Sequence, residues 1–92
     1  MNRDELIEEL GIFFDECLWL AKQKNRDYAK EDDALCNFRQ GAGQVAARID
    51  EKSIRLSNLL AGAEANFEGV EDTLMDIANY AAIAYVLVKA RK

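Results

Sequence analysis

Two carboxylates, an amide and a phenol gather on one face of a helix predicted near the C-terminal end of the sequence. At about 100° per residue, Asp72, Asp76, Asn79 and Tyr80 share this face. Apolar residues continue it towards the C-terminal end: Ile83, Val86, Leu87 and Ala90. Because carboxylates are costly to bury without a partner, we expect a cation, a metal ion or a cluster of donors beside them.

We expect the polar groups to sit beside a buried seam, and the opposite face of this helix is apolar. It consists of Val70, Leu74, Ile77, Ala81, Ala84, Tyr85 and Val88. Glu71 and Asp72 fall in the first turn, where the helix dipole favours negative charge, so they require no functional explanation. Asp76 lies beyond that turn and shares a face with Asp72, so its charge indicates a nearby cation.

A preceding helix supplies candidate cations. Its apolar stripe, Val45, Ile49, Leu56 and Leu59 or Leu60, is interrupted at the i+7 position by Lys52, and Arg48 and Arg55 flank the lysine. If this helix packs on the last one, its cations approach Asp72 and Asp76. Two interpretations remain open: a structural salt-bridge network, or a polar pocket in which the cations bind phosphate and the carboxylates bind Mg²⁺.

The elements that position these residues are predicted to be helices. Asn2 and Glu5 resemble a capping box before a helix over residues 4–24, and a polar linker spans residues 25–31. Asp32 or Asp33 is expected to cap a short second helix that runs through Arg39. A bend at Gly41 and Gly43 precedes a third helix that ends near Gly62. A loop through Asn66 and Gly69 then leads to the last helix.

Composition favours one all-α domain over residues 1–92, a bundle of three or four helices. The 92 residues are 50% hydrophobic and contain no proline and five glycines. The last helix is apolar nearly all round from Ala81 to Val88, which predicts that the chain forms a homo-oligomer. Trp19 and Ile54, each on the less apolar side of its helix, are expected to mark a surface for self-association.

Charge and residue types exclude several functions. The net charge of −5 argues against binding to duplex nucleic acid, and the absence of histidine excludes the usual hydrolase triads and His-ligated metals. Cys17 and Cys36 lack the spacing of a zinc site or a disulfide framework. The N-terminal residues do not read as a signal peptide, and the apolar run near the C terminus is too short for a membrane span. We therefore expect a cytoplasmic location, in the host cytoplasm if a phage encodes the protein.

Four segments resemble the family called nucleotide modification associated domain 1, which occurs largely in bacteriophages and bacteria. They follow the same order over most of the chain from Lys24 onward. The most specific parts are residues 52–58 and residues 71–80. The segments are Lys24-Asn25-Arg26-Asp27-Tyr28, Asp33-Ala34-Leu35-Cys36-Asn37-Phe38, Asp50-Glu51-Lys52-Ser53-Ile54-Arg55-Leu56-Ser57-Asn58-Leu59-Leu60 and Val70-Glu71-Asp72-Thr73-Leu74-Met75-Asp76-Ile77-Ala78-Asn79-Tyr80. The resemblance implies a phage-type protein connected with nucleotides.

A fainter similarity links the chain to the all-α nucleoside triphosphate pyrophosphatases of the MazG type, which hold Mg²⁺ with acidic residues on two helices. Asp50 and Glu51 precede Asp72 and Asp76 at a suitable distance. Ile54 and Thr73, however, stand where that pattern has acids. The missing ligands weaken the expectation of two-metal catalysis, because less negative charge remains to hold the metals.

Three hypotheses follow. The first is a nucleotide-binding protein, with or without Mg²⁺-dependent phosphohydrolase activity; the second is a non-catalytic binder that sequesters a host nucleotide or signalling molecule. The third is a helical interaction protein whose polar cluster only fixes helix register. The candidate residues are Glu51, Asp72 and Asp76 for Mg²⁺, Lys52 and Arg55 for phosphate, Tyr28 or Tyr80 against the base, and Asn37 and Asn58 as further binding residues.

Overall fold

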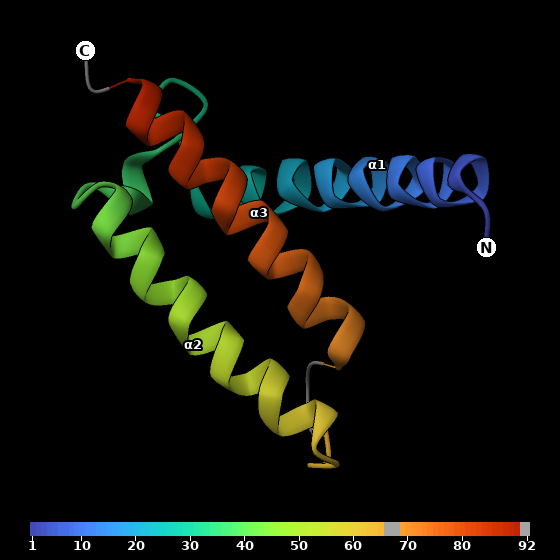
Figure 1. Cartoon of the computed structure of the whole chain (residues 1–92). Helices are drawn as coiled ribbons and strands as arrows, with labels where there is room; N and C mark the ends of the chain where they lie inside the picture. Colours follow the sequence, from blue (N-terminus) through green and yellow to red (C-terminus); the bar gives the residue numbers. More distant parts are fainter. Residues whose placement is uncertain (66–68, 91–92) are drawn as a thin grey trace. The chain divides into compact units, whose positions relative to one another are not determined.

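Helices dominate the computed structural model, which describes residues 1–65 and 69–90 (Figure 1). They are α1 (Arg3–Tyr28), α2 (Ala42–Leu60) and α3 (Val70–Lys89), with a short 3-10 helix η1 (Cys36–Phe38) between the first two. No strand occurs in the described ranges, so the all-α prediction is confirmed. The chain divides into two compact units, Met1–Asn37 and Phe38–Lys92. The loop predicted through Asn66 lies outside the described residues.

The first unit consists mainly of α1, which begins where the sequence predicts. The Asn2 side-chain carbonyl accepts the Glu5 N–H at 2.9 Å, as expected of an N-cap residue. The helix ends at Tyr28, four residues beyond the predicted end, so the expected linker over residues 25–31 is partly helical. The Asn25 amide explains the extension, since it donates to the Ala34 carbonyl at 2.7 Å and stabilises the last turn.

The predicted short second helix is only the three residues of η1. The Asp33 backbone carbonyl accepts the Cys36 N–H at 3.2 Å, and Asp33 also forms an isolated β-bridge with Lys30. These contacts hold residues 30–36 in successive turns. The prediction of a helix reaching Arg39 was therefore wrong in its length.

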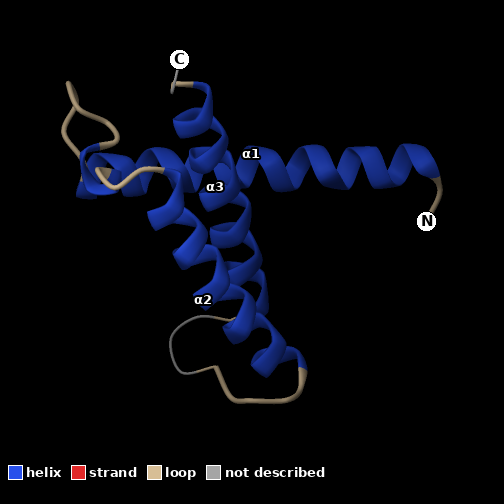
Figure 2. Cartoon of the chain, turned by 60° about the vertical axis from the view of Figure 1, so that its left-hand side comes forward, coloured by secondary structure: helices blue, strands red, loops and turns tan. Residues whose placement is uncertain are grey.

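In the second unit, α2 and α3 lie side by side and run in opposite directions (Figures 1 and 2). The predicted stripe of α2 is its covered face: Val45 has no exposed surface, and Ile49, Leu56 and Leu59 are half-buried. Lys52 is half-buried in the same stripe. The packing of the third and last predicted helices is thus confirmed.

The covered face of α3 is the polar one, and Asp76 lies beside a buried seam as the sequence predicts. Thr73 and Asp76 are the buried residues of this helix, whereas Leu74, Tyr85 and Val88 of the opposite, apolar face are exposed. Polar groups fit inside because they have partners: the Thr73 hydroxyl donates to the Gly69 carbonyl at 2.8 Å, and Asp76 meets Lys52. In the described ranges, no helix combines the length and hydropathy that a membrane span requires.

Candidate functional site

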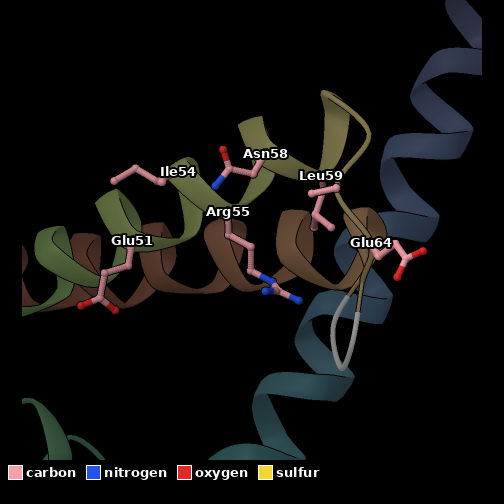
Figure 3. Close-up of a pocket in the computed structure, with 7 residues that line it drawn as sticks. Glu51, Ile54, Arg55, Asn58, Leu59 and Glu64 are labelled. Carbon is pink, nitrogen blue, oxygen red and sulfur yellow. The ribbon is translucent and has the colours of Figure 1, made fainter.

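An open hollow lies at the C-terminal end of α2, entirely within the second unit (Figure 3). Its volume is about 290 Å³, close to the lower limit for sites that hold a small molecule. We call it the α2 hollow. Its lining residues are Glu51, Ile54, Arg55, Asn58, Leu59, Ala63 and Glu64.

The end of α2 shapes this hollow through a Schellman motif. The Gly62 N–H donates to the Leu59 carbonyl at 3.1 Å, and the Ala63 N–H donates to the Asn58 carbonyl at 3.0 Å. Gly62 has φ +105°, a conformation that side chains other than glycine rarely adopt. The motif turns the chain back after the helix, and it thereby brings Ala63 and Glu64 beside Asn58.

Four of the lining side chains extend from two different sides of α2. Glu51 and Arg55 are four residues apart and extend from one side of α2, whereas Ile54 and Asn58 extend from another side (Figure 3). Arg55 is half-buried, and its Nε atom is out of contact with solvent. The lining of the hollow therefore contains one partly desolvated guanidinium, one amide and two carboxylates.

A guanidinium and an amide are suited to polar recognition. Arginine presents planar N–H donors that match phosphate or carboxylate oxygens, and asparagine both donates and accepts hydrogen bonds. The carboxylates of Glu51 and Glu64 outnumber the one guanidinium, so the lining carries a net negative charge. An anionic ligand would therefore need a cation to accompany it.

Lys52 and Asp76 form an ion pair between α2 and α3. The Lys52 Nζ lies 3.0 Å from the Asp76 Oδ2, and the two side chains are 22% and 9% exposed. The expectation that a cation of the third predicted helix reaches Asp72 or Asp76 is confirmed. Because Asp76 is already neutralised by Lys52, the pair agrees with the salt-bridge interpretation of the polar cluster.

Asp72 interacts with a backbone N–H group instead of a cation. Its Oδ2 accepts the Gly69 N–H at 3.3 Å, across the first turn of α3. The carboxylate thus caps the N terminus of the helix, where negative charge also interacts favourably with the helix dipole. This contact agrees with a structural role that requires no ligand.

The proposed metal ligands Glu51, Asp72 and Asp76 do not form one cluster. Glu51 lines the α2 hollow, Asp72 caps α3 and Asp76 pairs with Lys52. Across residues 1–65 and 69–90, no group of three or more His, Cys, Asp or Glu residues is arranged to hold a metal ion. Any Mg²⁺ bound to the hollow would therefore take most of its ligands from phosphate and water.

The remaining predicted site residues are divided between the two units. Tyr80 packs edge-on against Phe38, with ring centroids 6.4 Å apart, and it is half-buried. Asn37 and Tyr28 belong to the first unit and are exposed. Of the nine predicted residues, the hollow brings together three: Glu51, Arg55 and Asn58.

Sequence reasoning missed the lining contributed by Leu59, Ala63 and Glu64, and it assigned Ile54 to self-association only. The signal for Ala63 and Glu64 was present in Gly62, because a glycine just past a helix predicts that the chain turns back over the last turn. Applying this rule to the end of the third predicted helix would have placed the next residues beside Asn58.

Comparisons with known proteins give no further guidance: no family model, no curated protein and no solved structure matches the chain. The two family resemblances noted from the sequence therefore stay predictions.

Proposed function

We propose that the α2 hollow binds a nucleotide or a nucleotide-like small molecule together with Mg²⁺. The observation that carries the proposal is the placement of Arg55 and Asn58 in one hollow with two carboxylates. Arg55 binds a phosphate group and Asn58 hydrogen-bonds to the sugar or the base. The sequence resemblance to nucleotide modification associated domain 1 supports the same class of ligand.

In this proposal Mg²⁺ binds together with the ligand. A phosphorylated molecule meets repulsion from Glu51 and Glu64, and Mg²⁺ bound to its phosphates removes that repulsion. Magnesium commonly uses one or two protein carboxylates, with phosphate oxygens and water completing its shell. Glu51 is the carboxylate assigned to this role, because it extends from the same side of α2 as Arg55 (Figure 3).

The size of the hollow restricts the ligand. A volume of about 290 Å³ suits a single nucleotide rather than an oligonucleotide. The net charge of −5 also disfavours long polyanions. The proposed ligand class is therefore a mononucleotide or a small signalling molecule built from one.

Calorimetric titration with nucleoside mono-, di- and triphosphates, with Mg²⁺ and then with a chelator, tests this proposal. We expect binding that requires Mg²⁺ and that Arg55→Gln weakens roughly 10- to 100-fold, the loss expected for a charged hydrogen bond. Arg48→Gln is the matched control, because Arg48 is an exposed arginine on α2 outside the lining. No binding by any nucleotide, or an equal loss in both variants, would refute the proposal.

Product analysis in the same mixtures separates the two nucleotide hypotheses. Release of pyrophosphate or phosphate indicates a phosphohydrolase. Binding without turnover instead indicates a protein that sequesters a host nucleotide or signalling molecule.

A second candidate function is that of a helical interaction protein with a structural polar cluster. The Lys52–Asp76 pair favours it, because these charges neutralise each other between α2 and α3. This candidate predicts that no nucleotide binds. It also predicts that changes at Lys52 or Asp76 alter only the stability of the fold.

A further inference from the structure

Apolar side chains are exposed on several sides of α1: Trp19, which the sequence singled out for self-association, is 64% exposed but lies about 140° from Phe14, and three others share one face. Ile7, Phe14 and Leu18 are 61%, 60% and 56% exposed, and Cys17 is the buried residue of this helix. At about 100° per residue, these three residues and Gly11 point within roughly 60° of one another. We call these four residues the α1 seam. Their spacing of four, three and four residues is that of a helix-pairing surface.

Helix α1 has no second long helix in its own unit. The first unit contains α1, the turns after it and the start of η1, as described for residues 1–37. A helix of 26 residues obtains most of its stability from packing an apolar face, so an exposed seam of this length indicates a partner.

Charge along α1 specifies how two copies pair. Residues 3–16 carry six acidic side chains and Arg3, a net charge of −5, whereas residues 22–27 carry Lys22, Lys24, Arg26 and Asp27, a net charge of +2. A parallel pair would place the two acidic halves side by side. An antiparallel pair places each acidic half against a basic half and also aligns the helix dipoles favourably.

We propose that α1 of one copy packs antiparallel on α1 of a second copy through the α1 seam, so that the protein is a dimer. In the fully overlapped arrangement, Phe14 packs against Leu18 of the second copy. Glu8 then approaches Lys22 of the second copy at the edge of the interface. This inference uses residues of the first unit only, so it does not depend on nucleotide binding by the α2 hollow.

Sedimentation equilibrium at micromolar concentration tests the dimer. We expect the wild-type chain to have a dimer mass and Phe14→Glu to raise the dimer dissociation constant roughly 100-fold, because a carboxylate would be buried in the interface. Ile12→Glu is the control: Ile12 is also an exposed apolar residue of α1, but it lies about 160° from Phe14. A wild-type monomer would overturn the proposal and leave the seam to the same chain or to another protein. Equal weakening by both variants would also overturn it.

A distance measurement in an unaltered seam tests the orientation. A spin label on Asp4→Cys, with both native cysteines replaced by alanine, lies about 36 Å from its counterpart in an antiparallel pair of fully overlapped helices. In a parallel pair the two labels lie about 10 Å apart. The short distance, or no measurable pair of labels, would overturn the proposal.

Reversal of the basic half gives an independent check of orientation. The variant Lys22→Glu, Lys24→Glu and Arg26→Glu places acidic halves against acidic halves in an antiparallel pair, so we expect a monomer. In a parallel pair the same changes replace one like-charge contact by another. An unchanged dimer would therefore contradict the antiparallel arrangement.

Discussion

Helix α1 and the α2–α3 pair differ in which side chains they cover and which they expose. In the pair, the covered face of α3 carries Asp76, which Lys52 neutralises, while Tyr85 and Val88 on the more apolar side are exposed. In α1, Ile7, Phe14 and Leu18 are exposed, and the charges are separated along the helix. The apolar content of a face therefore does not by itself identify the face that packs within a unit. The presence of a partner for its polar groups matters as much.

The comparison also separates two kinds of surface. The polar groups of α3 have partners within their unit, whereas no second long helix among residues 1–37 packs on the α1 seam. The proposed ligand site accordingly uses residues of the second unit, and the proposed helix pairing uses residues of the first.

The largest expected effect belongs to the ion pair that joins α2 and α3. Asp76→Asn leaves the half-buried Lys52 ammonium without its counter-charge. We expect the free energy of unfolding to fall by about 3 kcal/mol, the lower end for a broken buried pair, because Lys52 keeps some contact with water. Urea denaturation without ligand or metal measures the change through the transition midpoint.

Two further variants sharpen this test. Glu71→Gln removes an exposed acid from the first turn of α3, so the same change of charge should cost only about 0.3 to 1 kcal/mol. The double variant Lys52→Met and Asp76→Asn should recover part of the loss, because no unpaired charge remains. If Asp76→Asn is as stable as the wild type, the pair does not hold the helices together and a ligand role for Asp76 regains support.

The next effect concerns the glycine that ends α2 and shapes the hollow. Gly62→Ala should lower the free energy of unfolding by about 1 to 2 kcal/mol, because φ +105° is strained for a residue with a Cβ. The added atom would meet nothing within 4 Å, so the cost is conformational rather than steric. The transition midpoint in urea again reports the change.

Gly43→Ala is the matched control for this prediction. Gly43 lies inside α2 with helical backbone angles and open space around its Cα, so the same substitution should stabilise the fold by about 0.5 kcal/mol. Opposite signs for the two variants would confirm that the backbone at Gly62 matters. Equal signs would contradict this explanation.

Local signals in the sequence predicted the ends of helices only where the capping contacts are local. Asn2 marked the start of α1 and Gly62 the end of α2, because caps depend on neighbouring residues. The end of α1 was misplaced because Asn25 bonds to Ala34, nine residues away. The side of α3 that packs on α2 followed from Lys52, because a lysine in an apolar stripe requires an acidic partner, whereas periodicity alone gave α3 apolar residues on both sides.

The candidate site shows the same limit. Lys52 interrupts an apolar stripe, and this anomaly correctly predicted an acidic partner on the last helix. The sequence did not indicate that the pair would leave Arg55 and Asn58 in a separate hollow, because that depends on how the chain turns after Gly62. The sequence offered nine candidate residues, but only three of them line this hollow.

A smaller effect is expected at the start of α1. Asn2→Ala removes the acceptor for the Glu5 N–H and should lower the stability by about 1 kcal/mol. Asn2→Ser keeps an acceptor at the cap and should restore most of the loss. Urea midpoints for the two variants measure the difference. Equal stability of the alanine and serine variants would show that this cap contributes nothing.

Cys17, the buried residue of α1, is expected to differ from Cys36 in reactivity. Burial, and secondarily the negative charge of Glu16, raises the pKa of the Cys17 thiol above its usual value. A higher pKa leaves less thiolate at a given pH, so Cys17 should be alkylated more slowly than Cys36, which is half-buried.

Iodoacetamide labelling of Cys36→Ala and Cys17→Ala isolates the two rates across the alkaline range. Glu16→Gln should accelerate Cys17 only slightly, since burial is the larger cause, and unfolding in urea should remove the difference between the two thiols. A Cys17 as reactive as Cys36 in the folded protein would show that this face of α1 is open to solvent, which would widen the contrast between α1 and the α2–α3 pair.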